Sequence, residues 1–176
     1  MEDQQQRAVY AWEAQWHGWV NKSASQRAVR RAIRKAERLY RIPASPISFY
    51  TKAKNKEGSL LPSKFDYGHP RGGIRLRPQH CNIAIGLHEA AHAIMVALMG
   101  WTPKGIEDHG PQWLGVYLYL LADAGLAPRV ALEASARDAG LRWTSPAKVG
   151  PKKIRKHYRG LVKKAKADSL FYKLVQ

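Results

Sequence analysis

The chain is poor in cysteine, in acidic residues and in long apolar runs. Cys81 is the only cysteine among 176 residues, so the chain cannot form an internal disulfide or build a zinc site from cysteine pairs. No run of about eighteen uninterrupted apolar residues occurs, which argues against a transmembrane helix. The opening MEDQQQRAVYAWEAQW is polar and acidic where a secretory signal would be basic and then apolar. These shortages predict a cytoplasmic protein with one substantial core and extensions.

Acidic residues are few relative to basic ones, and the imbalance is local. Thirteen Asp and Glu oppose 30 Lys and Arg, for a formal net charge of +17. Residues 21–43 carry basic side chains at helical spacing beside an apolar stripe, which predicts a basic amphipathic helix. Residues 148–174 follow Pro146 and Pro151 and are expected to form a basic helix, or an arm that orders on binding.

Such concentrated positive charge favours polyanions through counterion release, without sequence preference. Nucleic acid is the expected partner, and an anionic membrane surface is the main alternative. A solvated charged face with no partner is the remaining interpretation. The candidate nucleic-acid-binding residues are Arg30, Arg31, Arg34, Lys152, Lys153, Arg155, Lys156 and Arg159.

The stretch GLHEAAHAIMVALMG, residues 86–100, contains a His-Glu-x-x-His pattern formed by His88, Glu89 and His92. Residues four apart lie on one face of an α-helix, so both imidazoles can reach one metal ion while Glu89 stays off the metal as a general base. The apolar, alanine-rich sequence predicts a buried helix that starts at Gly86 and stops at Gly100. Burying these polar groups is costly unless they are paired or bound, which favours a metal site over a chance pattern.

Catalytic zinc sites usually take three protein ligands and keep a fourth position for water. His109 is the predicted third ligand, because Pro111 and the apolar run 113–121 place it just before a helix N-terminus. The positive end of a helix keeps an imidazole neutral, which is the form that binds metal. A loop histidine bonded to backbone is the alternative.

HEAAH, a gap of sixteen residues and then HGPQW together resemble the SprT-like family of zinc metalloproteases, whose pattern is HExxH followed by His-Gly-x-x-aromatic. The resemblance spans about residues 70–125. It implies a zinc-dependent peptidase acting on protein or peptide, with His88, His92 and His109 as zinc ligands and Glu89 as general base. The best-known members cut proteins attached to DNA.

This chain departs from the family in one respect, and a different third ligand is the alternative to His109. Many SprT-like proteins carry a C-terminal zinc ribbon of cysteine pairs, which a chain with one cysteine lacks. In another group of HExxH enzymes, the gluzincins, the third ligand is a glutamate from a later helix. Glu133, in a helix predicted within APRVALEASARDAGL, is therefore a second candidate ligand.

The expected fold class is α+β, with a small zincin-type metalloprotease core in which a short sheet packs on the HExxH helix, and with basic helical N- and C-terminal extensions. The predicted domains are a basic N-terminal helical segment (1–45), the core (46–145) and a basic C-terminal helix or arm (146–176). Alternating runs at 47–51 and 74–77 predict strands. The second run is expected to be either an ordinary strand or an edge strand that pairs with an extended substrate.

Two other functions remain open at this stage. One is a non-catalytic nucleic-acid-binding protein in which a metal only braces the fold. The other is a zinc hydrolase of non-protein amides, such as those of peptidoglycan.

Overall fold

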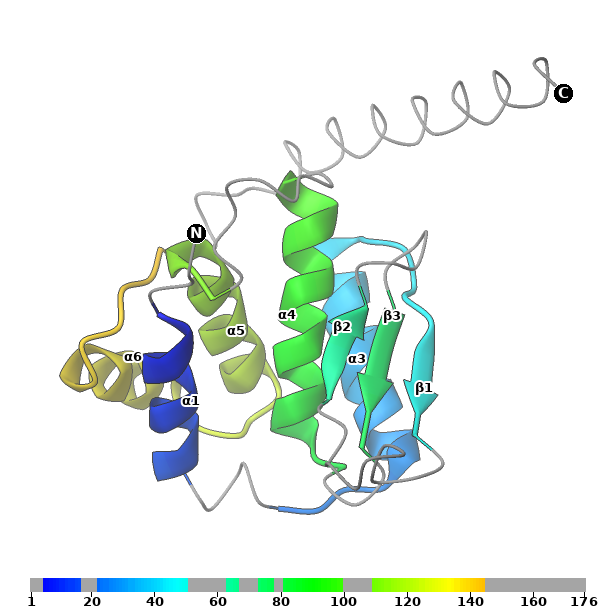
Figure 1. The fold of residues 1–176 in the computed structure, drawn as a ribbon, viewed down its shortest axis with the longest axis horizontal. Coiled ribbons are helices and arrows are strands. Elements are labelled where there is room, and N and C mark those ends of the chain that lie inside the picture. The colour runs from blue at the N-terminus through cyan, green and yellow to red at the C-terminus, as the bar shows by residue number, and fades with distance from the viewer. Residues whose placement is uncertain are drawn as a thin grey trace, which may run out of the picture.

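The computed structural model describes residues 5–16, 22–50, 63–66, 73–77, 81–99 and 109–144. These residues form an α+β fold of helices around one small sheet (Figure 1). The elements in chain order are α1 (Gln6–Gln15), α3 (Gln26–Tyr40), β1 (Ile47–Phe49), β2 (Lys64–Asp66), β3 (Gly73–Leu76), α4 (Ile83–Met99), α5 (Pro111–Asp123) and α6 (Arg129–Asp138). The basic C-terminal segment predicted at 146–176 lies outside the described residues.

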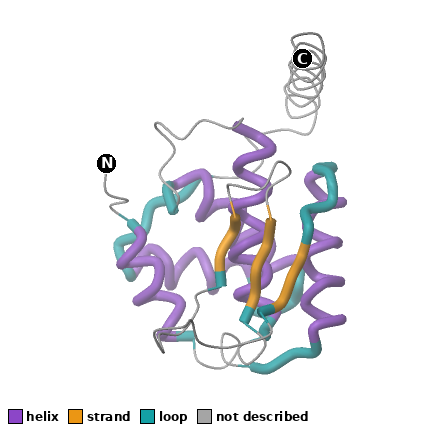
Figure 2. The backbone as a smooth tube through the Cα atoms, turned by 45° about the vertical axis from the view of Figure 1, so that its right-hand side comes forward, coloured by secondary structure: helices purple, strands orange, loops and turns teal. Residues whose placement is uncertain are grey.

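The sheet has the strand order β1-β3-β2 (Figure 2). Strand β1 pairs with β3 in parallel, with Ile47 opposite Ile74, and β2 pairs with β3 antiparallel, with Phe65 opposite Ile74. Strand β3 is therefore the central strand, and both of its edges are used. Of the two alternatives for residues 74–77, the substrate-binding edge strand is wrong, because an extended peptide can add only to an unpaired edge, and the ordinary strand is the one observed.

Helix α4 lies between the sheet on one side and helices α1, α5 and α6 on the other (Figure 1). It contacts β2 and β3 on one side and α5 on another, and α3 packs along it. Helix α6 packs on α5, and α1 joins the same group through side-chain hydrogen bonds to α6. This arrangement surrounds α4 with protein and explains why its sequence is apolar almost all round.

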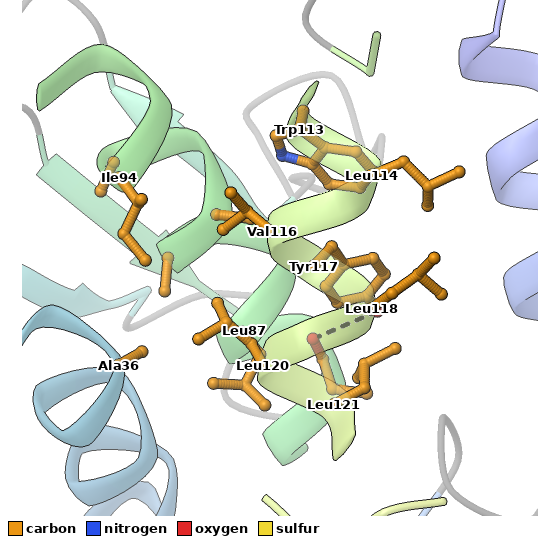
Figure 3. Close-up of a cluster of buried hydrophobic side chains, with 14 of the residues drawn as sticks. Ala36, Leu87, Ile94, Trp113, Leu114, Val116, Tyr117, Leu118, Leu120 and Leu121 are labelled. Carbon is orange, nitrogen blue, oxygen red and sulfur yellow. Dashed lines mark hydrogen bonds between the residues drawn. The ribbon is translucent and has the colours of Figure 1, made fainter. Parts of the chain in front are cut away.

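The core is continuous from the N-terminal helices to α6. Val9 and Trp12 of α1 belong to the same buried cluster as Ile33 of α3, Leu87 of α4 and Leu132 of α6. Large side chains of α5, including Trp113 and Tyr117, fill the centre of this cluster, as Figure 3 shows. The predicted boundary at residue 45 stays a prediction, although residues on both sides of it share this core.

Helix α3 confirms the predicted amphipathic helix. Its apolar face is buried at Val29, Ile33 and Ala36. The Ser25 side chain caps the N-terminus by accepting a hydrogen bond from the Ala28 amide at 3.1 Å. The helix ends at Arg41, which adopts a left-handed conformation with φ of 55°.

Helix α4 starts earlier than the glycine pattern predicts. It begins at Ile83, where the Asn82 side chain accepts a hydrogen bond from the Ile85 amide at 2.7 Å. Gly86 therefore lies inside the helix and does not mark its start. A Cβ atom on Gly86 would meet Val29 Cγ1 at 2.6 Å, so the glycine is there for close packing of α3 against α4. The predicted stop at Gly100 lies outside the described residues.

Within the described part of the chain, none of the helices combines the length and the apolar character needed to cross a membrane.

Candidate metal centre

Three histidines converge where α4 meets the start of α5. His88 and His92 lie one turn apart on α4, and His109 immediately precedes α5. One ring nitrogen from each lies within 4.8 Å of the others, and Nε2 of His88 is 3.2 Å from Nε2 of His109. The three residues are only 6%, 7% and 2% exposed, in that order. These buried side chains are close enough to bind one metal ion.

The sequence around His109 explains how it reaches the other two. Gly110 is the extended N-cap of α5, and Pro111 occupies its first turn. Trp113 then turns back beneath the cluster, with ring centroids 4.7 Å from His88, 5.1 Å from His92 and 4.6 Å from His109. The HGPQW segment thus supplies both the third imidazole and the indole ring that contacts all three histidines.

One of the three nitrogen pairs already has the spacing of two ligands on a single metal ion. Two nitrogens bonded to such an ion at about 2.0–2.1 Å would lie about 3.3 Å apart, close to the 3.2 Å between His88 and His109. Burial, followed by the charges of His88 and His109, holds the pKa of His92 well below its usual value. His92 is therefore neutral near pH 7, as a metal ligand must be.

Glu89 lies beside the cluster and outside the group of potential ligand atoms. Its side chain is buried, and its carboxylate accepts a hydrogen bond from the backbone of Phe65 in β2. Burial raises the pKa of Glu89 to about 7. The charge of His88 and the hydrogen bond from the Phe65 backbone oppose this rise, and the charge of Glu13 adds to it. A carboxyl group of this kind can exchange a proton near neutral pH.

Glu13 of α1 is a member of the site that the sequence did not reveal. Its Oε1 lies 2.8 Å from Nδ1 of His88. Burial alone would raise the pKa of Glu13. The charge of His88 and hydrogen bonding with His88 and Tyr117 lower the pKa by more than burial raises it, so the net shift is downward. Burial likewise lowers the pKa of His88, and the charge and hydrogen bond of Glu13 more than reverse this. In the absence of a metal, each of the two groups therefore stabilises the charged form of the other.

The rest of α1 also borders the cluster. The Tyr10 ring stacks on His88 at 5.9 Å between centroids and meets His109 edge-on at 5.3 Å. Just before the helix, the Gln5 amide donates to the His109 carbonyl at 2.9 Å and accepts from the Arg142 amide at 2.7 Å. Helix α1 therefore forms one side of the site.

Glu133, the second candidate ligand, lies away from the cluster. It is on α6, where it accepts a hydrogen bond from Arg129 Nε at 2.7 Å one turn earlier. It is not among the described residues that could share a metal with the histidines.

The basic residues predicted on α3 differ in their availability. Arg30 donates to the Ile47 carbonyl at 2.8 Å and lies over the Phe49 ring. Arg34 pairs with the buried Glu37 at 2.5 Å. Arg31 is exposed, whereas Lys152, Lys153, Arg155, Lys156 and Arg159 lie outside the described residues. Two of the three α3 candidates thus already have partners within the fold.

Comparison of the chain with protein-family models, with curated proteins and with solved structures gave no match.

Proposed function

We propose that this chain is a zinc-dependent metallopeptidase of SprT-like type, with a zincin-type core. His88, His92 and His109 would hold the zinc, and Glu89 would be the general base. The observation that supports this most is the joint placement of three buried imidazoles and a separate buried carboxyl group at one position. A metal that only braced the fold would not require a buried carboxyl group beside it that lies outside the ligand set.

Zinc, when bound, would supply a Lewis acid that lowers the pKa of a water and polarises the scissile carbonyl. The chain's own contribution is proton transfer and orientation. Glu89 takes a proton from the attacking water and delivers it to the leaving amine. The Phe65 amide fixes the carboxylate by donating a hydrogen bond to it.

Strand β2 is a better candidate for the substrate-binding strand than β1 or β3. Within the described sheet it is an edge strand, and it contacts α4. Its Phe65 bonds directly to Glu89, so a peptide lying along β2 would pass next to the general base. Strand β1 is the opposite edge, separated from α4 by the other strands (Figure 1). An extended peptide that adds to β2 would gain backbone hydrogen bonds without needing a particular side chain.

Nucleic acid is the proposed second partner, on the basis of charge alone. Arg27, Arg31 and Arg38 are exposed and form no ion pair with any residue in the described ranges. Their spacing of four and seven residues puts them on one face of α3. We expect these three, together with the basic segment 146–176, to contact phosphates, and substrate proteins to be those held near nucleic acid.

The decisive test compares the wild-type chain with Glu89→Gln. Wild type should bind about one zinc and cleave an unfolded protein such as casein, and Glu89→Gln should keep the zinc and lose cleavage, because this carboxyl group moves protons and does not bind the metal. Equal activity of the two proteins would instead indicate a structural metal site. Cleavage of peptidoglycan amides without cleavage of protein would indicate the other hydrolase class.

A further inference from the structure

The His88 ring is held at both of its nitrogens. Nδ1 lies 2.8 Å from the Glu13 carboxylate, and Nε2 faces Nε2 of His109 at 3.2 Å. A carboxylate can only accept a hydrogen bond, so Nδ1 must carry the proton of this contact. The lone pair of neutral His88 is then confined to Nε2, which is the nitrogen that faces the other histidines.

We propose that Glu13 is a positioning residue that fixes the tautomer and ring orientation of His88 for metal binding, and that α1 is consequently a part of the metal centre. This inference rests on the metal site of the proposed function, but not on its peptidase activity. Glu13 itself would not touch the metal.

The residues around Glu13 restrict the position of its carboxylate. The Tyr117 hydroxyl is a second hydrogen-bonding neighbour of this carboxylate, and it also lies 3.4 Å from the Ala84 carbonyl oxygen. Tyr117 is completely buried, and its ring is 5.0 Å from Trp113 and 6.4 Å from Trp12. The tyrosine cannot easily move, so the carboxylate that it contacts is fixed as well, and His88 with it.

The need to hold α1 against the rest of the fold does not explain why the Glu13 carboxylate is buried beside His88. The helix is already held by Trp12 and Trp16, whose indole nitrogens donate to Ser135 Oγ at 2.6 and 2.8 Å. Gln5 adds bonds to His109 and Arg142 at the other end. A buried ion pair is weak support for stability compared with apolar packing, so the Glu13–His88 pair is better explained by what it does to His88.

The coupling has a reciprocal consequence. If Glu13 in the packed α1 strengthens metal binding, the bound metal must strengthen the packing of α1 by the same factor. Zinc should therefore slow amide hydrogen exchange in residues 6–15 of the wild-type chain, including the region around Trp12.

The test measures zinc affinity by competition with a chromogenic chelator in Glu13→Ala and Glu13→Gln. The Ala variant should bind zinc 10–100-fold more weakly than wild type, as is usual when the hydrogen-bond partner of a ligating histidine is lost. The Gln variant keeps an acceptor oxygen and should lose less. Glu133→Gln is the matched control, because it removes an equal charge from a helix outside the site, and its affinity should equal that of wild type.

A spectroscopic measurement on the wild-type protein does not depend on whether any variant folds. Long-range ¹H–¹⁵N NMR of the zinc-loaded chain should show a proton on Nδ1 of His88 and none on Nε2. A proton on Nε2, or wild-type zinc affinity in a folded Glu13→Ala protein, would overturn the proposal, as would failure of the wild-type chain to bind zinc. Absence of peptide cleavage alongside the expected affinities would reject the peptidase and leave the role of Glu13 supported.

Discussion

Gly86 and Val29 meet where α3 crosses α4, so closely that a Cβ atom on the glycine would lie 2.6 Å from Val29 Cγ1. The crossing is two residues before His88. The orientation of the helix that carries two of the three histidines is thus set partly by contact with the basic helix.

Gly86→Ala tests this contact. Alanine favours a helix interior by about 1 kcal/mol over glycine, but overpacking a buried site costs about 1–3 kcal/mol, and Val29 is too buried and too stiff to move freely. We expect a net loss of about 1 kcal/mol in the free energy of unfolding, measured by urea denaturation. Adding Val29→Ala should make room, so the double variant should be more stable than the sum of the two single changes predicts. Strict additivity would show that the two residues do not press on each other.

Alanine at His88, His92 or His109 should abolish stoichiometric zinc binding, because each change removes one of the three clustered imidazole nitrogens. The measurement is the metal content of purified protein by mass spectrometry. Glu133→Ala should retain zinc. Retention in His109→Ala together with loss in Glu133→Ala would move the chain to the gluzincin class.

Glu89→Gln should change stability in the metal-free protein in a way that depends on pH. The folded chain raises the pKa of Glu89 from 4.5 to about 7, so it binds this proton more tightly than the unfolded chain does. Stability contributed by the protonated group is complete below pH 4.5 and is lost as pH rises through about 7. At about 1.4 kcal/mol per unit over about 2.5 units, the loss approaches about 3.5 kcal/mol.

Glutamine has no acidic proton to lose, so metal-free Glu89→Gln should gain stability over metal-free wild type by up to about 3.5 kcal/mol at pH 8 and much less at pH 5. Chemical denaturation at the two pH values in the presence of a chelator measures the difference. The same stability gap at both pH values would rule out a raised pKa for Glu89.

Binding to nucleic acid should fall steeply with salt. A plot of log K against log[salt] should have a slope of about −0.9 for each neutralised duplex phosphate, with little dependence on sequence. Charge reversal at Arg27, Arg31 and Arg38, whose side chains are exposed on one face of α3, should weaken binding by at least tenfold and make the slope less steep. Zinc content should not change. Arg30→Gln is the informative comparison, because Arg30 already bonds to Ile47, so this variant should lose stability more than affinity.

Two results would redirect this prediction. Salt-sensitive binding to anionic vesicles, but to neither DNA nor RNA, would identify a membrane surface as the polyanion. Unchanged nucleic-acid affinity after reversal of the three α3 arginines, combined with loss after reversal of Lys152, Lys153, Arg155 and Lys156, would place the contact in the C-terminal segment alone.

The histidines were predictable because short sequence patterns define them. His88 and His92 share a helix face, and Pro111 marks the start of α5 just after His109. His109 meets His88 across 21 residues of chain, so its place in the cluster was predicted from the joint HExxH and HGPQW pattern and not from periodicity. The amphipathic helix α3 followed from local spacing alone.

Glu13, the strand order and the position of Gly86 could not be predicted in this way. Glu13 meets His88 across 75 residues of chain, and nothing in the sequence of α1 marks an acid that faces a metal site. Strand β2 has only three residues, too few for alternation to show. Which strand lies at an edge depends on tertiary pairing, and a glycine inside a helix resembles a stop signal until the neighbouring helix is known.

The contacts of α1 also bear on how the chain folds as it is made. Trp12 and Trp16 are synthesised 123 and 119 residues before Ser135, their hydrogen-bond acceptor, and Gln5 precedes its partner Arg142 by 137 residues. Such distant contacts form slowly and late. Two tryptophans of a nascent chain therefore stay without their native partners until nearly all the described fold has left the ribosome. During that interval they are a natural target for chaperones and a source of aggregation.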